Sequence, residues 1–400
     1  MIKMREKIKK LVESCKGELI ELRRHFHAHP EPSFEEYETT KLIAQKLKEY
    51  GVDEIKVGCG GKASGVIATI RGLFDRPMIA LRADIDALKM KEENQSIPYR
   101  SQNEGVMHAC GHDAHIAVLL ITAKVLAQLK GELPGSVRLI FQPAEETAAG
   151  AKEIIKAGGL DGVDAIAGLH VWAYLPSGVL GFRKGPFFAA VDRIEINVKG
   201  KGGHGAAPQF AVDPIVMASN IVLALQTIVS REVDPIEPAV VSICKIEGGT
   251  AFNIIPEEVK MVGTIRTFSP QTRERVVKRV EEISTNVAKA MRGSVEFIDY
   301  YSTPALINDP NFTEFAASVA RDLFGERSVV EADINMGGED FSLYVEKVPG
   351  TFFLLGTGNK DKGTDKAHHN PYFDVDDDAL PIGVELFANI VFEFLRGGKR

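Results

Sequence analysis

Short apolar runs alternate with amphipathic segments in the first and last parts of the chain. Runs typical of buried strands cover residues 65–70, 78–83, 137–141, 164–169 and 351–355. Helical patterns at 112–130 and 148–158 separate several of them, and further helices are expected before Pro30, at 310–324 and at 377–396. This alternation predicts an α/β fold with a mixed, mostly parallel sheet that has helices on both faces.

A capping signal and alternating histidines follow the first helix. Ser33 with Glu36 has the form of a capping box, so we expect the next helix to begin there and to end at Gly51. His27 and His29 precede Pro30. Local hydrogen bonding explains them better than metal binding does.

The pattern changes from about Arg193. Strands are expected at 193–198, 239–246, 259–267 and 295–300, with helices from Pro214 and from Pro270. The order β-α-β-β-α-β is that of a ferredoxin-like unit. Since it interrupts the first pattern, we predict a discontinuous domain of residues 1–186 and 300–400 and an inserted α+β domain of residues 187–299.

Composition narrows the class of protein. The chain has 400 residues, a hydrophobic fraction of 44% and a net charge of -7, which gives no footprint for nucleic acid or anionic lipid. Its lysine-rich start does not look like a signal peptide, and the apolar run near Ile116 is stopped by Lys124, too early for a membrane span. The 4 cysteines are far apart, so we expect a reducing, cytoplasmic setting.

Candidate metal ligands cluster in the stretch from His108 to His115 (HACGHDAH). Thiolate and imidazole suit zinc, so Cys110 and His112 are candidates, although a buried thiol beside a helix-capping histidine would look the same. Further polar residues follow the apolar runs, where parallel strands gather ligands. These are Asp84, Asp86, Glu145, Glu146 and His170, and either His368 or His369 comes later.

The adjacent residues Glu145 and Glu146 could have two different roles. In extended chain neighbouring side chains point opposite ways, so one carboxylate can bind metal while the other faces a substrate. A free carboxylate of this kind is what metal-assisted hydrolysis requires. The plainer interpretation is a solvated helix start, but the apolar run and Pro143 before the pair favour a buried position.

With these motifs the chain resembles the dinuclear metallo-amidohydrolase and carboxypeptidase family that includes aminoacylases, hippurate hydrolases and auxin-conjugate hydrolases. The matching stretches run in the family's order over nearly the whole chain. They are LRRHFHAHPEPSFEE at 22–36, RADIDAL at 82–88, HACGHDAH at 108–115, FQPAEE at 141–146, GLH at 168–170, GGHGAAP at 202–208, GGTAFNIIP at 248–256, GGEDF at 337–341 and HHN at 368–370.

The resemblance implies a phosphorylase/hydrolase-like catalytic domain and an inserted lid and dimerisation domain. It implies that two divalent metal ions are held by five ligands, with Cys110 as the bridge. The ligands are Cys110, His112, Glu146, His170 and His369. Zinc suits the thiolate best, with manganese, cobalt or nickel as alternatives. Glu145 would be the general base and then the acid.

The remaining roles also come from the resemblance. His204 would reach over from the partner subunit of a homodimer to stabilise the oxyanion. Asn253 and Arg266 would bind the substrate carboxylate, and Arg266 offers a planar fork for it. Asp84 would orient a ligating histidine. Much of the wider family has a histidine where this chain has Arg82, which agrees with the amidohydrolase branch.

The expected activity is hydrolysis of the amide bond of N-acyl-L-amino acids, with short peptides as further substrates. An N-acetyl-diaminopimelate deacetylase and an auxin-conjugate-type hydrolase remain open, because these differ in pocket shape. A non-catalytic protein that binds small molecules in the same pocket is the alternative of another class. The presence of Glu145 beside a full set of ligands disfavours it. No nucleic-acid or membrane partner is expected.

Overall fold

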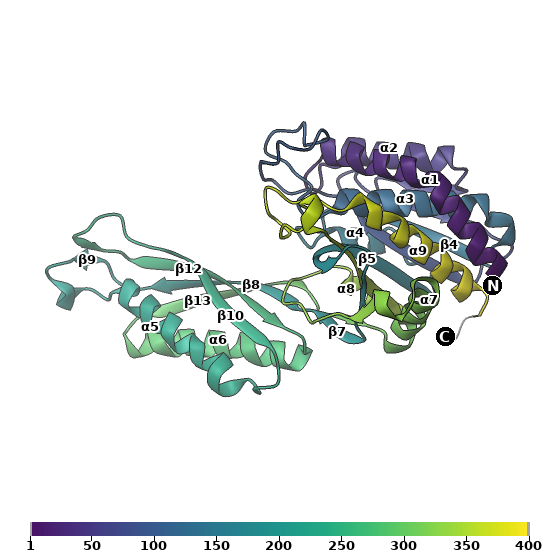
Figure 1. Ribbon diagram of the computed structural model, residues 1–400. Coiled ribbons are helices and arrows are strands. Elements are labelled where there is room, and N and C mark those ends of the chain that lie inside the picture. Colours follow the sequence, from purple (N-terminus) through teal and green to yellow (C-terminus); the bar gives the residue numbers. More distant parts are fainter. Residues whose placement is uncertain (1, 398–400) are drawn as a thin grey trace. The chain divides into compact units, whose positions relative to one another are not determined.

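A computed structural model describes residues 2–397 (Figure 1). The chain forms two compact units. The first unit comprises the chain up to Gly185, Ile307–Asp333 and the part from Asp340 onward, and the second comprises Pro186–Leu306 and Ile334–Glu339. The first unit is therefore built from both ends of the sequence.

The first unit contains an eight-stranded sheet in the order β1-β2-β4-β3-β5-β16-β6-β15. The neighbours β4, β3, β5 and β16 run parallel, and the pairs β1–β2, β2–β4 and β16–β6 are antiparallel. The predicted mixed sheet with a parallel centre is thus confirmed. Its strands are β1 (Glu54–Val57), β2 (Val66–Ile70), β3 (Met78–Asp84), β4 (Ser136–Gln142), β5 (Ala165–Pro176), β6 (Leu180–Phe182), β15 (Val329–Glu331) and β16 (Gly350–Gly358).

Helices pack on both faces of this sheet because alternate strand residues are buried on each side. One buried cluster joins β3 residues Ile79 and Leu81 to five helices. These are α1 (Ile2–Ala28), α2 (Tyr37–Glu49), α3 (His112–Gln128), α7 (Pro310–Phe324) and α9 (Leu380–Leu395). On the opposite face Gly168 lies against Phe341, just before α8 (Ser342–Val345), which contacts α4 (Gly150–Lys156).

The second unit has a four-stranded antiparallel sheet in the order β10-β12-β8-β13. Its helices α5 (Pro214–Thr227) and α6 (Pro270–Ala290) follow β8 and β12, so the elements occur in β-α-β-β-α-β order. Strand and helix side chains share one apolar core that includes Ile196, Met261 and Val280. The strands are β8 (Ala190–Lys199), β10 (Ala239–Glu247), β12 (Glu258–Thr267) and β13 (Ser294–Thr303), and the short strand β9 (Gly203–His204) pairs with β11 (Ile254–Ile255). A separate short pair of the chain is β7 (Gly185–Phe188) with β14 (Leu306–Asn308).

The predicted capping box before α2 is wrong. The hydroxyl of Ser33 donates to Oδ2 of Asp86 at 2.6 Å, and the N-cap residue Glu36 makes no side-chain cap bond. The carboxylate of Glu31 instead accepts the N–H groups of Glu38 and Thr39 at 3.2 and 2.8 Å. The spacing of Ser33 and Glu36 could not show that the Ser33 hydroxyl forms a hydrogen bond with Asp86, which is far away in the sequence.

One helical stretch, Pro214–Glu232, is long and apolar enough to cross a membrane by length and composition alone, which the sequence analysis did not notice. It consists of α5 and the π-helical turn Ile228–Glu232. Met217, Ile221 and Leu225 on this stretch are buried in the core of the second unit. The stretch is thus a packed helix of that unit, and one third of it is buried.

Candidate metal centre

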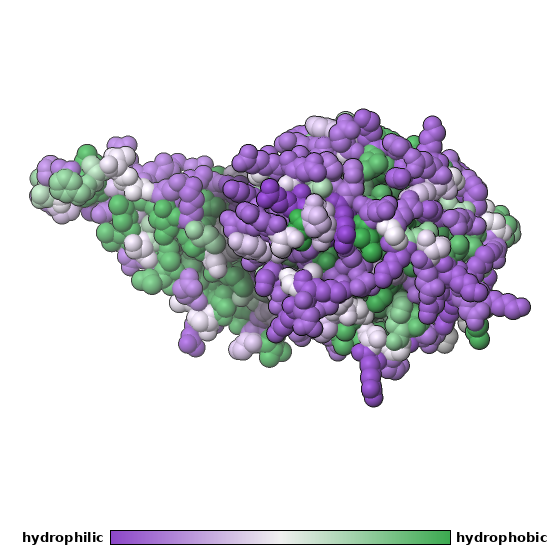
Figure 2. All heavy atoms as spheres, turned by 45° about the horizontal axis from the view of Figure 1, so that its top comes forward, coloured by the Kyte–Doolittle hydropathy of each residue, from purple (hydrophilic) through white to green (hydrophobic). Residues whose placement is uncertain are grey.

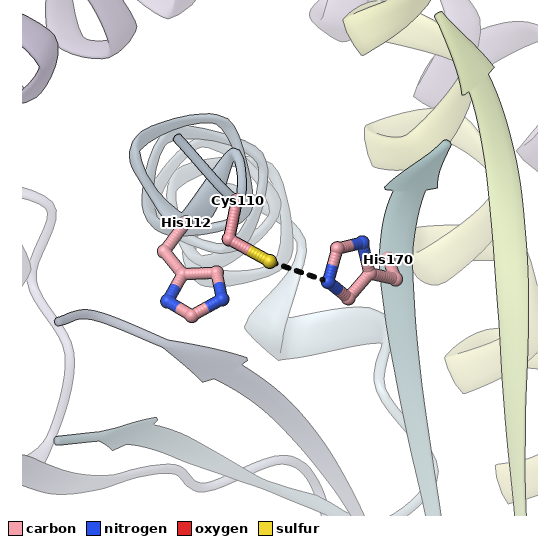
Figure 3. Close-up of side chains that lie close together, drawn as sticks. All are labelled: Cys110, His112 and His170. Carbon is pink, nitrogen blue, oxygen red and sulfur yellow. Dashed lines mark hydrogen bonds between the residues drawn. The ribbon is translucent and has the colours of Figure 1, made fainter. Parts of the chain in front are cut away.

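A tight turn before α3 presents the first two candidate ligands. Gly111 is the N-cap of α3 with φ 85°, a left-handed conformation that favours glycine. A Cβ at Gly111 would lie 2.3 Å from a methyl carbon of Val171. Because the turn is this close to β5, the side chains of Cys110 and His112 meet His170 of that strand, as Figure 3 shows. Sγ of Cys110 lies 3.5 Å from Nε2 of His170.

Backbone carbonyls orient two of the imidazoles. Nδ1 of His112 bonds to the carbonyl oxygen of Asp86 at 2.9 Å, and Nδ1 of His170 bonds to that of Val171 at 2.6 Å. With Nδ1 as the donor, Nε2 of each ring is the nitrogen left for a cation once the ring is neutral, which is the arrangement usual for ligating histidines. Burial also holds the pKa of His170 well below its usual range, which keeps that ring neutral.

Glu145 and Glu146 lie in a turn after β4 and not in extended chain, which corrects the sequence-based expectation. Ala144 has φ 54°, an unusual value for a residue with a side chain. The two carboxylates both approach His112, because one oxygen of each lies within 4.8 Å of the other and of a ring nitrogen of His112. Oε1 of Glu146 lies 3.5 Å from Nε2 of His369, whereas Oε2 of Glu145 lies 4.0 Å from Nε2 of His112.

The structure distinguishes between the two adjacent histidines near the end of the chain. His369 has φ 61°, its N–H donates to the carbonyl oxygen of Ala109, and its ring faces Glu146. His368 points elsewhere, with its ring 4.9 Å from that of Trp172 and 4.8 Å from that of Phe373. Burial lowers the pKa of His368 to about 3, so it is a neutral packing residue.

The five predicted ligands form two groups that share Cys110. One group is Cys110, His112 and His170, and the other is Cys110, Glu146 and His369. Within each group the ligand atoms lie within 4.8 Å of one another. Each group is thus compact enough to surround a cation, and all five residues belong to the first unit.

The surroundings of the two ligand groups favour a positive charge. Nε2 of His112 and Oε1 of Glu146 are buried without a hydrogen-bond partner among the described residues. Burial lowers the pKa of His112, but the carboxylates of Asp84, Asp86 and Glu146 outweigh burial and raise it to about 10. A buried spot that favours positive charge and holds unpartnered donor atoms suits two divalent cations.

Asp84 bonds to a histidine outside the predicted ligand set. Its Oδ1 accepts from Nδ1 of His115 at 2.5 Å, and its Oδ2 accepts from Arg82 at 2.6 Å. Nε2 of His115 in turn accepts the N–H of Val171 at 2.9 Å, so both nitrogens of that ring are occupied. Asp84 lies 3.7 Å from Nε2 of His112, close to the centre but without a hydrogen bond to that ring.

Sequence reasoning missed a buried network behind the centre. His29 bonds within its own turn, as expected, but His27 contacts Asp113 at 2.8 Å and Glu92 at 3.2 Å, both far along the chain. The guanidinium of Arg23 lies 3.0 Å from Asp113. Arginine and histidine four residues apart on one helix face were the available signal.

Three predicted site residues belong to the second unit. His204 is exposed, and its Nδ1 accepts the N–H of Ala206 at 3.0 Å. The carbonyl oxygen of Asn253 accepts the N–H of Gly205 at 2.8 Å, so His204 and Asn253 occur in neighbouring loops. Nε of Arg266 donates to Oγ1 of Thr264 at 3.0 Å, and burial lowers its pKa. Of these three residues, the structure places His204 and Asn253 in neighbouring loops of the second unit.

A carboxylate beside a cluster of thiolate, imidazole and carboxylate donors, near the carboxyl ends of parallel strands, is an arrangement for metal-assisted hydrolysis. Fold and site together define a metal-dependent hydrolase. The chain belongs to the peptidase family M20/M25/M40, whose model matches residues 80–393. The resemblance noted from the motifs is thereby confirmed.

Individual relatives cover almost the whole chain. An N-acetylcysteine deacetylase of Bacillus subtilis is 44% identical over 93% of this chain and 95% of its own. Thermostable carboxypeptidase 1 of Saccharolobus solfataricus is 41% identical over 97% of this chain and 98% of its own. A solved Bacillus subtilis structure, described as a dinuclear metal-binding peptidase of the M20 family, matches with a TM-score of 0.83 and 40% identity over 96% and 99% of the two chains.

Proposed function

We propose that this protein hydrolyses the amide bond of N-acyl-L-amino acids. The observation that carries the proposal is the placement of two adjacent carboxylates at the ligand cluster, with Glu146 3.5 Å from His369 and Glu145 4.0 Å from His112. The deacetylase relative is named for a substrate of this class. Carboxypeptidase action on short peptides is the second candidate, favoured by the carboxypeptidase relative.

Two divalent cations are proposed to bind, one in each ligand group, with Cys110 as the shared ligand. The arrangement of donor atoms supports two positions, and the related solved structure is described as dinuclear. Zinc is the first choice because thiolate and imidazole are its usual ligands, and manganese, cobalt or nickel are alternatives. When bound, the cations supply Lewis-acid chemistry that polarises the substrate carbonyl and lowers the pKa of water.

The proposed roles of the protein's own groups follow from their chemistry. Glu145 takes a proton from the attacking water and gives it to the leaving amine nitrogen. His204, supplied by a second copy of the chain, donates a hydrogen bond to the developing oxyanion. Arg266 and Asn253 hold the substrate carboxylate, a role for which the guanidinium offers paired donors. Asp84 acts indirectly, through the charge that it places beside His112.

The second unit is proposed to act as a lid and to form a homodimer. On α5 and the turn after it, Val216, Leu223 and Val229 are exposed by 45%, 72% and 38%, and β10 is an edge strand of the four-stranded sheet. Figure 2 shows hydrophobic surface over the second unit. Exposed apolar side chains beside an open strand edge suit pairing with another copy. We also propose a reducing, cytoplasmic setting, since the four cysteines lie far apart in the sequence with no paired spacing.

Release of free amino acid tests the activity. Purified protein is assayed with N-acetyl, N-benzoyl and indole-acetyl amino acids and with dipeptides, before and after treatment with a chelator. We expect release from the N-acyl substrates, its loss after metal removal, and its return when metal is added back. Absent release would instead favour a protein that only binds small molecules, and release that persists after metal removal would contradict the metal-dependent mechanism.

Glu145→Gln tests the assigned base. The amide keeps the size of the side chain but cannot accept the proton, so kcat should fall by about 10² to 10⁴-fold. Metal content per chain should stay unchanged because Glu145 is not among the five ligands. Glu146→Gln is the matched comparison and should lose metal as well as activity. A Glu145→Gln enzyme that turns over at the wild-type rate would refute the mechanism.

A further inference from the structure

Three successive backbone N–H groups after β4 donate to buried carboxylates. The N–H of Ala144 donates to Oε1 of Glu36 at 2.9 Å. The N–H groups of Glu145 and Glu146 donate to Oδ1 and Oδ2 of Asp86 at 3.0 and 3.1 Å. Asp86 is only 1% exposed. Successive N–H groups that converge on negative charge form a concave anion site, and here the protein fills it with its own side chains.

We propose that Asp86 is the positioning residue that sets the base Glu145 and the ligand Glu146 relative to each other. The inference rests on the proposed function, because it takes the roles of those two glutamates from there. One rigid carboxylate accepts one N–H at each oxygen, so the two peptide groups cannot turn independently. The directions in which the two side chains leave the backbone are fixed as a consequence.

We call the two hydrogen bonds from the N–H groups of Glu145 and Glu146 to Asp86 the clamp. The turn needs it because the backbone conformation of the turn is unfavourable by itself. Ala144 and Ala148 both have φ 54° although neither is glycine. Residues with a side chain hold this conformation only where the surrounding structure imposes it. The carboxylates of Glu36 and Asp86 provide that constraint from the buried side of the turn.

Asp86 also reaches the first ligand group. Its carbonyl oxygen bonds to Nδ1 of His112 at 2.9 Å, and its Oδ1 lies 3.3 Å from the same nitrogen. Ser33 donates to Oδ2 at 2.6 Å and steadies the carboxylate from the loop before α2. A single residue therefore contacts the backbone of the base, the backbone of one ligand and the ring of another.

Asp84 does not share this role although it lies only two residues earlier. Its hydrogen bonds in the described part of the chain are to Arg82 and His115. Its negative charge bears on His112, but the turn that carries Glu145 is held by Asp86. Of the two acids in the Asp-Ile-Asp sequence, the second is the one that acts on the base.

Asp86→Asn tests the clamp with little change of volume. The new amide has one acceptor oxygen, and its NH₂ group would face an N–H of the turn, so one of the two bonds is lost. We expect kcat to fall roughly 10- to 100-fold, the usual effect of losing a residue that supports a metal site. KM should remain near the wild-type value, because the chemical step and not substrate binding is impaired.

Two further variants separate positioning from general damage. Ser33→Ala removes a bond to the same carboxylate but leaves both N–H bonds, so kcat should fall far less. At equal metal content, adding Asp86→Asn to Glu145→Gln should cost less than the full factor that Asp86→Asn costs alone, because the part of that loss that acts through Glu145 is already absent. A double variant that is slower by the full single-variant factor, at equal metal content, would show a merely structural role and overturn the proposal.

The failure of the inference is distinguishable from failure of the proposed function. Wild-type turnover by Glu145→Gln overturns both, whereas loss in Glu145→Gln with wild-type kcat in Asp86→Asn overturns only the clamp. If Asp86→Asn does not fold, Asp86→Ser replaces it, since the single hydroxyl oxygen cannot accept both N–H groups of the turn. A folded Asp86→Ser enzyme with unchanged kcat would then refute the clamp, and a lowered kcat at unchanged KM would support it.

Discussion

Gly111 separates the proposed ligands Cys110 and His112 and leaves no space for a side chain. We predict that Gly111→Ala destabilises the protein, because the new methyl group meets Val171 and alanine is strained at φ 85°. Overpacking of this kind costs about 1 to 3 kcal/mol in addition to the backbone strain. Denaturant unfolding measures the loss, and metal content should fall with it.

Gly105→Ala is the matched control. Gly105 has φ 79°, similar to that of Gly111, but no atom lies within 4 Å of where its Cβ would be. It therefore carries the backbone strain alone, of the order of 1 to 2 kcal/mol. Equal losses in the two variants would mean that the contact with Val171 does not matter.

Residue types revealed most of the centre before the structure did, but not the direction of individual side chains. Cysteine, histidine and glutamate after apolar runs marked segments that the structure brings close together. Which of His368 and His369 faces the centre depends on the φ of 61° at His369, and no pattern of types encodes it. For the same reason the use of the Ser33 hydroxyl by Asp86 could not be foreseen.

At the scale of elements, the end of α1 is tied to the start of α3 by a charged pair. Burial and Arg23 lower the pKa of His27, but Asp113 and Glu92 outweigh them and raise it to about 9. The ordinary value in an unfolded chain is about 6.5. A group whose pKa is raised by folding contributes stability that is complete below the lower value and is lost as pH rises through the higher one.

We therefore predict that the contribution of His27 to the free energy of unfolding declines between about pH 6.5 and pH 9. The measurement is the difference in unfolding free energy between wild type and His27→Gln across this range, with metal content held equal. Subtracting the variant removes the pH dependence of the ligands themselves. By the same linkage argument, the titration should fall within roughly pH 6 to pH 10. A free-energy difference that stays constant over this range would show that His27 is not charged in the folded protein.

Element types were predictable from hydrophobic periodicity, whereas short elements and turns were not. The longer strands and helices lie within a few residues of their expected positions, as with α7 and β12. The strands β6 and β15 have three residues each, too few to show a period. The turn at Glu145 looked extended because its left-handed Ala144 depends on tertiary contacts with Glu36 and Asp86.

At the scale of the whole molecule, mixing subunits tests whether His204 acts on the site of its own subunit or on that of the partner. Glu145→Gln and His204→Ala homodimers should each be nearly inactive. If His204 acts across the dimer, exchange of subunits creates a mixed dimer in which one site has both groups intact. Equal mixing should then restore about a quarter of the wild-type activity, since half of the dimers are mixed and each has one working site.

Leu223→Glu provides the control for that experiment. A charge on the exposed apolar face of α5 should weaken dimer formation, and sedimentation should show more monomer. Complementation should disappear with the dimer. Suppose that the subunits exchange but activity does not recover. His204 would then act on the site of its own subunit, or it would take no part in the reaction.

The order of segments along the chain has a consequence for biosynthesis. Cys110, His112 and His170 leave the ribosome before the second unit is made, whereas His369 follows about two hundred residues later. At ordinary translation rates that interval lasts roughly 10 to 40 s. A nascent chain thus contains one complete trio of proposed donors long before the other trio exists, so hydrolysis that needs both trios cannot begin until His369 has been made.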